Sequence, residues 1–469
     1  MQALELLLFY FTYILLFFSV AGYGFSFNNL LKINLSKNFG LIVILGLFFL
    51  TLISYLSIFF IPHSYLFNVI IFLIGLTLFI FNLDKIINFK FLILIISIIF
   101  IGFIVSKTHD DFAFYHLQQS INFSKSKIQF GLSNLDFSYA KHSSLLYLNS
   151  NFYLPYFKYY FFNAPNQFFL TAIIITLSIF VYDKKNEKFL RYFALFSLSY
   201  ILLKFTRSSE YGTDIIGQLL IILFIYLTIL FFLTNNVLLK KEILVISGLI
   251  CVFCFTLKTY FIFYALIYFY LILSLNIKFI INFIVEKYFY FVFIFMILFS
   301  YFSLNLISSG CLIYPIASLC FDDLIWSMPS QEVLEYKIWY ETWAKSIAGA
   351  GYVIENSENL IKKFYWIPFW FKNYFFGRFL DNLVLIVFLS VIFLVLFREK
   401  EKIYQTFNQH VWIVYLIINL ILIFWFLKHP SLRYGGYAPF FLIFLIPLSY
   451  NLSKFYFDEK KFIRNFKII

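Results

Sequence analysis

Charged residues are scarce in this chain. Asp, Glu, Lys and Arg make up 13% of the 469 residues, whereas hydrophobic residues make up 62%. Because soluble globular chains are about one quarter charged, this composition excludes an ordinary soluble protein. Apolar runs recur from end to end, and a helix needs about 20 apolar residues to cross a bilayer. Lipid cannot satisfy open backbone groups, so we expect these runs to be helices.

Cysteine is also scarce, with four residues in the chain. Cys251 and Cys254 lie inside an apolar run without further ligands nearby, which favours packing over a zinc site. Cys311 and Cys320 fall in one long polar segment. They could pair in an oxidising compartment, and the sequence leaves open whether they do.

Several functional motifs are missing. The chain has no Walker loop, Rossmann glycine pattern, serine elbow or zinc-ligand spacing, which argues against an ATP-driven pump. No basic stripe with interleaved aromatic residues indicates a nucleic-acid partner. The first apolar run lacks a basic leader and a clear cleavage site, so we interpret it as a retained helix.

The apolar runs predict an all-α, polytopic transmembrane bundle of about thirteen helices. The runs lie near 3–22, 40–60, 66–82, 91–105, 167–182, 191–205, 214–234, 243–257, 260–276, 288–306, 379–397, 410–427 and 436–450. Lys and Arg gather in alternate loops, and the more cationic set is expected in the cytoplasm. This rule also accounts for the net charge of +13. It places the N-terminus outside and the C-terminus in the cytoplasm.

Two long loops fall outside on this count and divide the chain. The predicted parts are N-terminal helices 1–105, a first outside loop 106–165, central helices 166–307, a second outside loop 308–377, and C-terminal helices with a cytoplasmic tail 378–469. Segment 331–348 has apolar residues at steps of three and four. That spacing predicts an amphipathic helix lying in the membrane interface.

The strongest local signal is an acidic pair that opens the first outside loop. Asp110 and Asp111 lie in the segment from Lys107 to His116. Read as a helix, residues 110–122 turn the two neighbouring carboxylates toward different faces, so we expect them to differ in role. A carboxylate near lipid is costly unless it is partnered, and it could act as a general base or help to hold a metal. The alternative is that one Asp caps the helix.

Other charged groups are expected at the outer ends of further helices. These residues are Lys204, Arg207, Glu210, Asp214, Lys258, Arg433 and Tyr434. Cations in such places could bind a lipid phosphate. The alternatives are a solvated turn or a lysine that only reaches for the interface. The sequence leaves open whether these groups converge.

The pattern resembles the GT-C superfamily of integral membrane glycosyltransferases. The likeness rests on Asp110-Asp111 in an outside loop, the helix that follows, the multi-helix body and the second outside loop. In that loop, Ser309-Gly310-Cys311-Leu312-Ile313-Tyr314-Pro315 resembles a stretch of uncharacterised bacterial members. The resemblance implies a polyprenyl-phosphate sugar donor and inversion at the anomeric carbon. It also implies that Asp110 or Asp111 activates the acceptor or binds a divalent metal such as Mg²⁺ or Mn²⁺.

We therefore expect transfer of a sugar from polyprenyl phosphate to a glycan, lipid or protein acceptor. The reaction would occur at the outer face of a bacterial inner (plasma) membrane, during cell-envelope glycan synthesis, with membrane lipids as further partners. Asp110 and Asp111 are the expected catalytic residues. The expected substrate-binding residues are His116, Lys204, Arg207, Glu210, Asp214, Lys258, Arg433 and Tyr434.

Three other functions stay open. A surface-polysaccharide polymerase or ligase also combines many helices with a large outside loop, but usually relies on loop arginines. A lipid or polysaccharide transporter would place charges and broken helices at the membrane midplane, with internal repeats. A non-enzymatic membrane scaffold would leave the outer charges unexplained.

Overall fold

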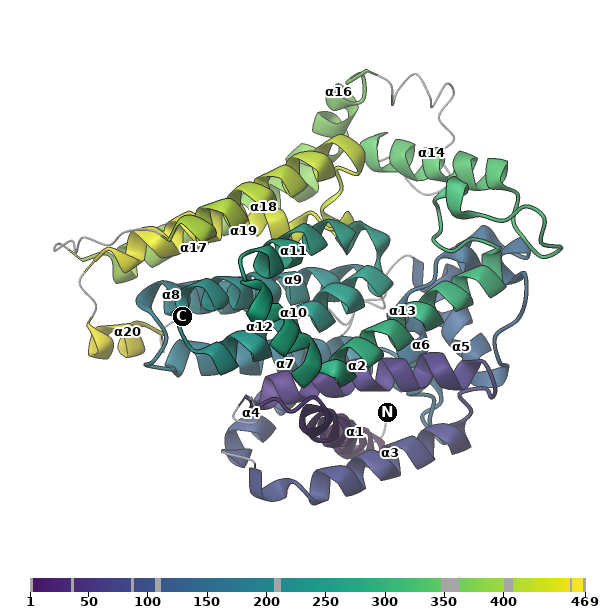
Figure 1. The fold of residues 1–469 in the computed structure, drawn as a ribbon, viewed down its shortest axis with the longest axis horizontal. Helices are drawn as coiled ribbons and strands as arrows, with labels where there is room; N and C mark the ends of the chain where they lie inside the picture. Colours follow the sequence, from purple (N-terminus) through teal and green to yellow (C-terminus); the bar gives the residue numbers. More distant parts are fainter. Residues whose placement is uncertain are drawn as a thin grey trace.

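The computed structural model is a bundle of helices (Figure 1). It describes residues 3–34, 38–85, 88–105, 111–205, 212–346, 361, 363–399, 408–455 and 458–466. No β-strand occurs within these ranges, where backbone pairing outside helices is limited to isolated bridges and turns. The predicted all-α class is therefore confirmed for the described part of the chain.

The N-terminal helices form one edge of the bundle. They are α1 (Ala3–Leu30), α2 (Phe39–Ile58), α3 (Tyr65–Ile80) and α4 (Phe89–Ile104), with the short turn η2 (Leu83–Lys85) before α4. Gly22 of α1 faces Gly75 of α3, and a β-carbon on Gly22 would overlap the carbonyl oxygen of Gly75. Small residues permit such close backbone approach between membrane helices. This glycine pair therefore sets the spacing between α1 and α3.

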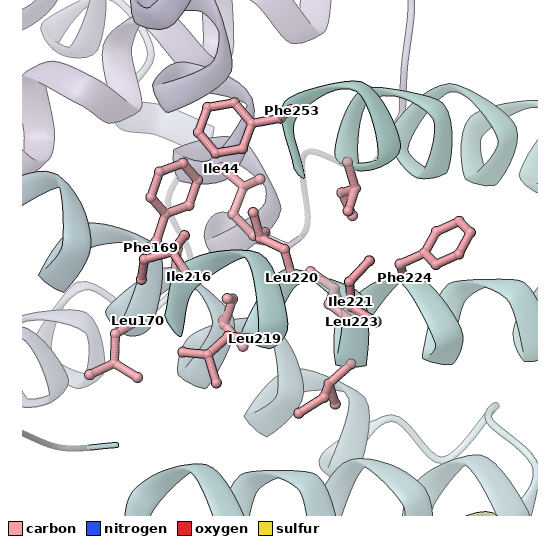
Figure 2. Close-up of a cluster of buried hydrophobic side chains, with 14 of the residues drawn as sticks. Ile44, Phe169, Leu170, Ile216, Leu219, Leu220, Ile221, Leu223, Phe224 and Phe253 are labelled. Carbon is pink, nitrogen blue, oxygen red and sulfur yellow. The ribbon is translucent and has the colours of Figure 1, made fainter. Parts of the chain in front are cut away.

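The central helices carry the core. They are α7 (Ala164–Tyr182), α8 (Lys188–Phe205), α9 (Asp214–Leu233) and α10 (Val237–Leu257). Nearly every residue of α7 and α9 is buried, as expected for helices that are apolar on all sides. Figure 2 shows side chains of α9 packed with Phe169 of α7, Ile44 of α2 and Phe253 of α10.

The second half of the chain begins with a sharply bent helix pair. The segments are η7 (Thr259–Tyr264), α11 (Ala265–Leu273), α12 (Ile277–Glu286), α13 (Tyr288–Ser309), α17 (Leu380–Phe397), α18 (Gln409–Lys428), α19 (Tyr437–Ser453) and α20 (Glu459–Phe466). The chain turns by 112° between Thr259–Leu273 and Ile277–Glu286. Asn276 caps α12 by accepting a hydrogen bond from the backbone N–H of Phe279 at 2.8 Å.

Short helical elements fill the two long loops and the last turn. They are η3 (Phe112–His116), α5 (Leu117–Lys125), η4 (Leu132–Asn134), η5 (Phe137–Ala140), α6 (Ser144–Ser150), η6 (Tyr159–Phe161), η8 (Ala317–Leu319), α14 (Ser330–Ser346), α16 (Ile367–Trp370), η9 (Phe371–Phe379) and η10 (Leu432–Tyr434). The helix predicted over 331–348 is confirmed over its described part as α14, and its placement in the membrane interface stays a prediction. Its apolar face packs on the first loop, where the rings of Tyr336 and Phe137 stack at 4.4 Å.

Part of the first loop is buried in the bundle. Every residue of α6 is buried, and the helix packs against α2. The Oγ of Ser150 lies 2.6 Å from Nδ1 of His63, whose Nε2 lies 2.8 Å from the Oγ of Ser57. Asn68 donates to the carbonyls of His63 and Ser150. These bonds fasten the loop to the ends of α2 and α3.

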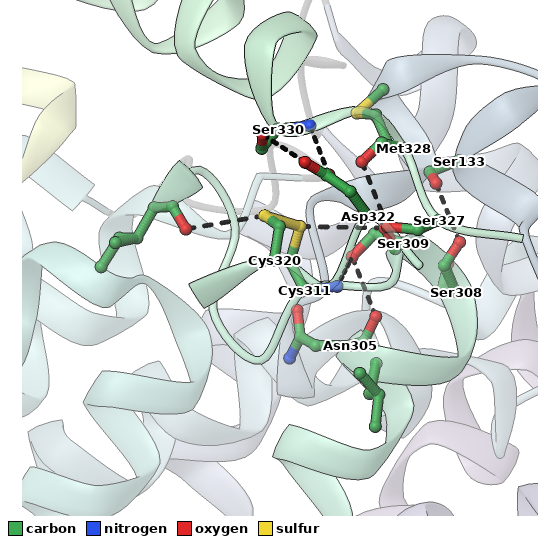
Figure 3. The surroundings of a disulfide bond; sticks show 12 residues. Ser133, Asn305, Ser308, Ser309, Cys311, Cys320, Asp322, Ser327, Met328 and Ser330 are labelled. Atoms are coloured by element: carbon green, nitrogen blue, oxygen red, sulfur yellow. Dashed lines mark hydrogen bonds between the residues drawn. A yellow bond between two sulfur atoms is a disulfide. The ribbon is translucent and has the colours of Figure 1, made fainter. Parts of the chain in front are cut away.

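A disulfide joins Cys311 to Cys320 at the start of the second loop (Figure 3). The sequence had left this pairing open. The same region is tied to the first loop by Ser133, whose hydroxyl donates to the carbonyl of Ser308 at 2.8 Å. Met328 closes the turn by donating its N–H to the carbonyl of Ser309 at 3.0 Å. The two long loops therefore form one unit.

Each predicted apolar run coincides with a helix of the structure, but the helices differ in length and charge. Within the described ranges, seven are long and apolar enough to cross a membrane, or up to eight if the bent pair is one span. Three others, α3, α4 and α19, are shorter. α8 carries charged residues near both ends, and α10 carries the charged run Lys240-Lys241-Glu242. The chain is thus an integral membrane protein, and the count of about thirteen crossings stays a prediction.

Candidate functional site

Four charged residues from distant parts of the chain form a continuous ionic cluster. Nη2 of Arg433 lies 2.7 Å from Oδ2 of Asp111, and Nε of Arg433 lies 3.2 Å from Oδ2 of Asp214. The other oxygen of Asp214 pairs with Nζ of Lys258. We call Asp111, Arg433, Asp214 and Lys258 the ionic cluster. Each acid in this chain of contacts lies next to a base, in the order just given.

Helix ends position this cluster. Asp214 opens α9, where the partial positive charge of the helix N-terminus favours a carboxylate. Lys258 follows the last residue of α10 in an extended conformation, and Arg433 lies on η10. The positive φ of 89° at Gly435, which ends η10, is readily adopted only by glycine.

Side-chain hydrogen bonds hold the turn that carries Arg433. The amide of Gln218 on α9 donates to the carbonyls of Leu432 and Arg433 at 3.2 and 3.3 Å, and its oxygen accepts from the N–H of Ala438 at 3.1 Å. The hydroxyl of Tyr374 accepts from the N–H of Leu432 at 2.7 Å. Because three of these four bonds are buried, the backbone that carries the guanidinium is held in place.

Aromatic rings flank the cations. Nζ of Lys258 lies 4.8 Å from the ring centroid of Tyr434, and the guanidinium carbon of Arg433 lies 5.1 Å from it. The guanidinium is also 5.5 Å from the ring of Trp343 on α14. These distances are within the range of cation–π attraction. Burial raises the pKa of Tyr434 to about 12, so its hydroxyl stays protonated at neutral pH.

A further lysine stands beside the ionic cluster. Nζ of Lys141 lies 4.5 Å from the ring of Tyr340, 5.2 Å from that of Tyr115 and 5.4 Å from that of Phe137. We call these three rings the aromatic box. Burial lowers the pKa of Lys141 to about 8, although Asp111 opposes the shift. Lys141 was missed by the sequence analysis because an isolated loop lysine carries no signal.

The ionic cluster is layered by exposure. The side chains of Asp111 and Arg433 keep 30% and 22% of their surface exposed, whereas Asp214 keeps 9%. The side chain of Lys258 keeps 23% exposed. A ligand arriving from outside would therefore meet Asp111, Arg433 and Lys258 before Asp214. Asp214 lies beneath them and bridges the two cations. This order separates an accessible carboxylate from a supporting one.

The family of the chain is shown by a match over most of its length. A family model described as a domain of unknown function, DUF8201, matches residues 6–440. The chain belongs to this family. No curated protein and no solved structure matches it. The DUF8201 match includes both long loops and all four residues of the ionic cluster.

The structure of this DUF8201 chain gathers several of the predicted site residues. Asp111, Asp214, Lys258, Arg433 and Tyr434 lie together in and beside the ionic cluster. Their convergence could not be read from the sequence. Asp110, Arg207 and Glu210 lie outside the described residues. The structure therefore does not place these three predicted site residues.

Two further predicted residues, Lys204 and His116, have contacts of their own with aromatic rings. Nζ of Lys204, at the end of α8, stands 5.5 Å from the ring of Tyr437 at the start of α19. His116 is buried, with 4% of its surface exposed, and its ring meets that of Tyr115 at 4.2 Å. His116 is therefore a buried residue of the first loop that contacts Tyr115, one of the rings of the aromatic box.

The local structure at Asp111 differs from the single helix expected over 110–122. A wider π-helical turn, η3, precedes α5. Asp111 stands at the N-terminus of η3 but makes no capping hydrogen bond there with its side chain. The side chain of Asp111 therefore does not cap this turn, while the capping alternative for Asp110 falls on a residue outside the described ones. Its carboxylate instead turns toward Arg433.

The described carboxylates do not match a metal centre. Across the described ranges, no group of three His, Cys, Asp or Glu side chains could hold an ion. Asp111 and Asp214 both pair with cations. We therefore derive no step through a divalent metal such as Mg²⁺ or Mn²⁺. The chemistry available from this arrangement is binding of an anion and transfer of a proton to a carboxylate.

Proposed function

We propose that this chain is an inverting membrane glycosyltransferase that moves a sugar from a polyprenyl-phosphate donor to an acceptor. The acceptor would be a glycan, lipid or protein of the cell envelope. The observation that carries the proposal is the alternation of acids and bases around Arg433. It sets an accessible carboxylate next to two cations, which are the two kinds of group that this reaction needs.

The reaction assigns a task to each side of the ionic cluster. An acceptor oxygen attacks the anomeric carbon, and its bond forms as the bond from that carbon to the phosphate oxygen breaks. Asp111 takes the proton of the acceptor hydroxyl. The leaving phosphate gains negative charge, which Arg433 and Lys258 stabilise. Asp214 touches both cations and holds them in register.

The setting of the ionic cluster supports a lipid-borne substrate. The cluster lies where α9 begins and α10 ends, so it is at one end of helices that are apolar and buried. A polyprenyl chain could then stay in lipid while its phosphate reaches the cluster. The disulfide in the second loop supports an oxidising outer compartment. We infer the outer face of a bacterial inner membrane, with the N-terminus outside and the C-terminus in the cytoplasm.

The test is sugar transfer by the purified chain in lipid nanodiscs. We expect Asp111→Asn to lower the turnover rate by about 100-fold or more, because general-base assistance contributes at least that much. Asp110→Asn is measured in parallel, since it neighbours Asp111. Asp323→Asn is the matched control, because Asp323 is an exposed carboxylate of the second loop. Full transfer by both Asp110→Asn and Asp111→Asn would end the proposal.

A surface-polysaccharide polymerase or ligase is the second candidate. The specific observation in its favour is that Arg433, a loop arginine, is shared by both carboxylates of the cluster. The two functions differ in their donor. A glycosyltransferase consumes a single sugar on polyprenyl phosphate, whereas a polymerase or ligase consumes a preassembled glycan on a lipid diphosphate. Offering the two donors separately to the wild type distinguishes them.

A further inference from the structure

Lys141 differs from the cations of the ionic cluster in its partners. Arg433 pairs with two carboxylates and Lys258 with one. Among the described residues, Lys141 has no carboxylate within ion-pair distance, and aromatic faces surround its ammonium instead. Ring faces attract a cation but do not accept its three N–H bonds as a carboxylate or phosphate oxygen does. Its ammonium therefore stays electrostatically under-compensated.

The groups that act on Lys141 come from every element around it. Asp111 and Tyr115 belong to the η3 turn, Tyr340 to α14, and Lys258 and Arg433 to the ionic cluster. Asp136, before η5, also acts on Lys141, but its carboxylate is exposed and caps the N–H of Ser138. The two neighbouring cations repel Lys141, and the described acid that acts on it most strongly, Asp111, already pairs with Arg433. A further anion would relieve this repulsion.

We propose that Lys141 binds the phosphate of the lipid-borne donor directly, and that the site selects a phosphodiester carrying one negative charge. This inference rests on the proposed glycosyltransferase function. The charges of Arg433 and Lys258 are already shared with carboxylates, whereas Lys141 pairs with no carboxylate among the described residues. Lys141 therefore keeps more of its charge available to the donor phosphate than the two paired cations do.

The charge balance favours a monophosphate over a diphosphate donor. Three described cations, Lys141, Lys258 and Arg433, face two described carboxylates, Asp111 and Asp214, that are at least partly shielded from solvent. The third described carboxylate that acts on Lys141, Asp136, is exposed, so water and salt screen its charge. One positive charge is left uncompensated, which one phosphodiester charge neutralises. A sugar diphosphate lipid brings a second negative charge beside Asp111, and like charges at short range oppose binding.

The aromatic box also links donor binding to both long loops. Tyr115 and Phe137 come from the first loop, and Tyr340 comes from α14 in the second. The hydroxyl of Tyr340 lies 3.3 Å from that of Tyr314, which follows Cys311 closely in the chain. A phosphate drawn to Lys141 would therefore be bound between the two loops. The box keeps the lysine side chain in place for that contact.

Binding of the donor phosphate by Lys141 is tested by measuring equilibrium binding to the wild-type protein in nanodiscs with native mass spectrometry. The probes are a short-chain polyprenyl-phosphate hexose, the matching diphosphate hexose, phosphatidylglycerol and inorganic phosphate. We expect the monophosphate hexose to bind tightest. Lys141→Met should raise its Kd by roughly 10-fold or more, because a charge-assisted hydrogen bond is lost. Lys141→Arg should keep most of the affinity, and Lys127→Met, an exposed lysine of the same loop, should change nothing.

The pH dependence gives a second readout. Lys141 is charged below its lowered pKa of about 8, so affinity should fall as pH rises through that value. Lys141→Arg should remove this fall, since arginine stays charged. Thermal unfolding checks that Lys141→Met folds, and the apolar methionine suits the aromatic box. An unchanged Kd in folded Lys141→Met, or tighter binding of the diphosphate, phosphatidylglycerol or inorganic phosphate, would overturn the inference.

The outcome separates this inference from the proposed function. If donor binding depends on Lys141 but no sugar is transferred, the proposed glycosyltransferase function is wrong and the anion site at Lys141 is supported. If sugar is transferred but Lys141→Met changes neither the Kd nor the KM for the donor, the glycosyltransferase function is supported and the role of Lys141 is wrong. A change in the KM for the donor with kcat preserved is the result expected if both are right.

Discussion

The two ends of the bundle use the same charged residue types in different ways. At the end where α10 begins, Lys241 pairs with Glu286 at 2.7 Å. Nζ of Lys287 donates to the carbonyls of Leu31 and Lys32 at 3.0 and 2.6 Å. At the end where α10 finishes, Lys258 joins a chain of shared partners. Lys241, in the first turns of α10, and Lys258, directly after its last residue, are about 25 Å apart along the helix axis.

The arginines show the difference most clearly. Arg191 gives both arms of its fork to one carboxylate, Glu459, at 2.7 and 3.0 Å, and a third bond to the carbonyl of Val181. Arg433 divides its fork between Asp111 and Asp214. A saturated bidentate pair fastens two elements together. A divided fork leaves each contact open to exchange with a ligand, so the second end is suited to binding.

The largest effect expected from this comparison is at Arg433. Arg433→Ala should abolish measurable transfer, with a loss of about 100-fold or more, because it removes the charge that stabilises the leaving phosphate. Arg433→Lys should not restore it, since one ammonium cannot serve two carboxylates in a fork. Arg191→Ala is the counterpart at the other end. It should lower the melting temperature while leaving kcat of the folded fraction unchanged.

The next largest difference is expected between the stability costs of replacing Asp214 and Glu286, the acids that pair with lysines at the two ends. Asp214 is nearly buried, so Asp214→Asn leaves Lys258 and Arg433 without their shared acid and should cost about 3 kcal/mol of stability. Glu286 keeps 51% of its side chain exposed, so Glu286→Gln should cost less than about 1 kcal/mol. Denaturation of both variants in one detergent measures the contrast. Equal costs would mean that the two ends are not different in kind.

Removal of the disulfide should change stability only at the end of the bundle that carries the ionic cluster. Cys311→Ser with Cys320→Ser should destabilise the joined loops by about 2 kcal/mol. Hydrogen exchange should then speed up in α14 and the first loop, because Val333 and Tyr314 share their small apolar core with Cys311. Amides near Lys241 and Glu286 should exchange as in the wild type. Faster exchange at both ends would show that the loops are not a separate unit.

The smallest effect is expected from the aromatic ring under the cations. Tyr434→Phe keeps the ring and should change the donor KM less than about twofold, whereas Tyr434→Leu removes a cation–π contact worth about 0.5–1 kcal/mol. That corresponds to roughly a two- to fivefold rise in KM. Steady-state kinetics at fixed acceptor concentration resolves the pair. A larger effect from Tyr434→Phe would assign the hydroxyl, not the ring, to binding.

Some parts of the site followed from local patterns, and others did not. Asp111 and Lys258 stood out in the sequence because each lies beside an apolar run, where a charge near lipid is costly unless it has a partner. α14 could be predicted from its spacing, but not its docking on the first loop, because an amphipathic face does not name its partner. Lys141 escaped notice because its importance comes entirely from Tyr115, Phe137 and Tyr340 around it.

The sequence by itself determined that the chain is helical, belongs in a membrane and carries charges at particular helix ends. Those properties are local, since transfer of a long apolar run out of water depends only on that run. Only the tertiary structure decided that residues 111, 214, 258 and 433 meet, and that Lys141 stands beside them. Such contacts arise from the packing of helices distant in the chain, and their energy depends on the partner as much as on the residue itself.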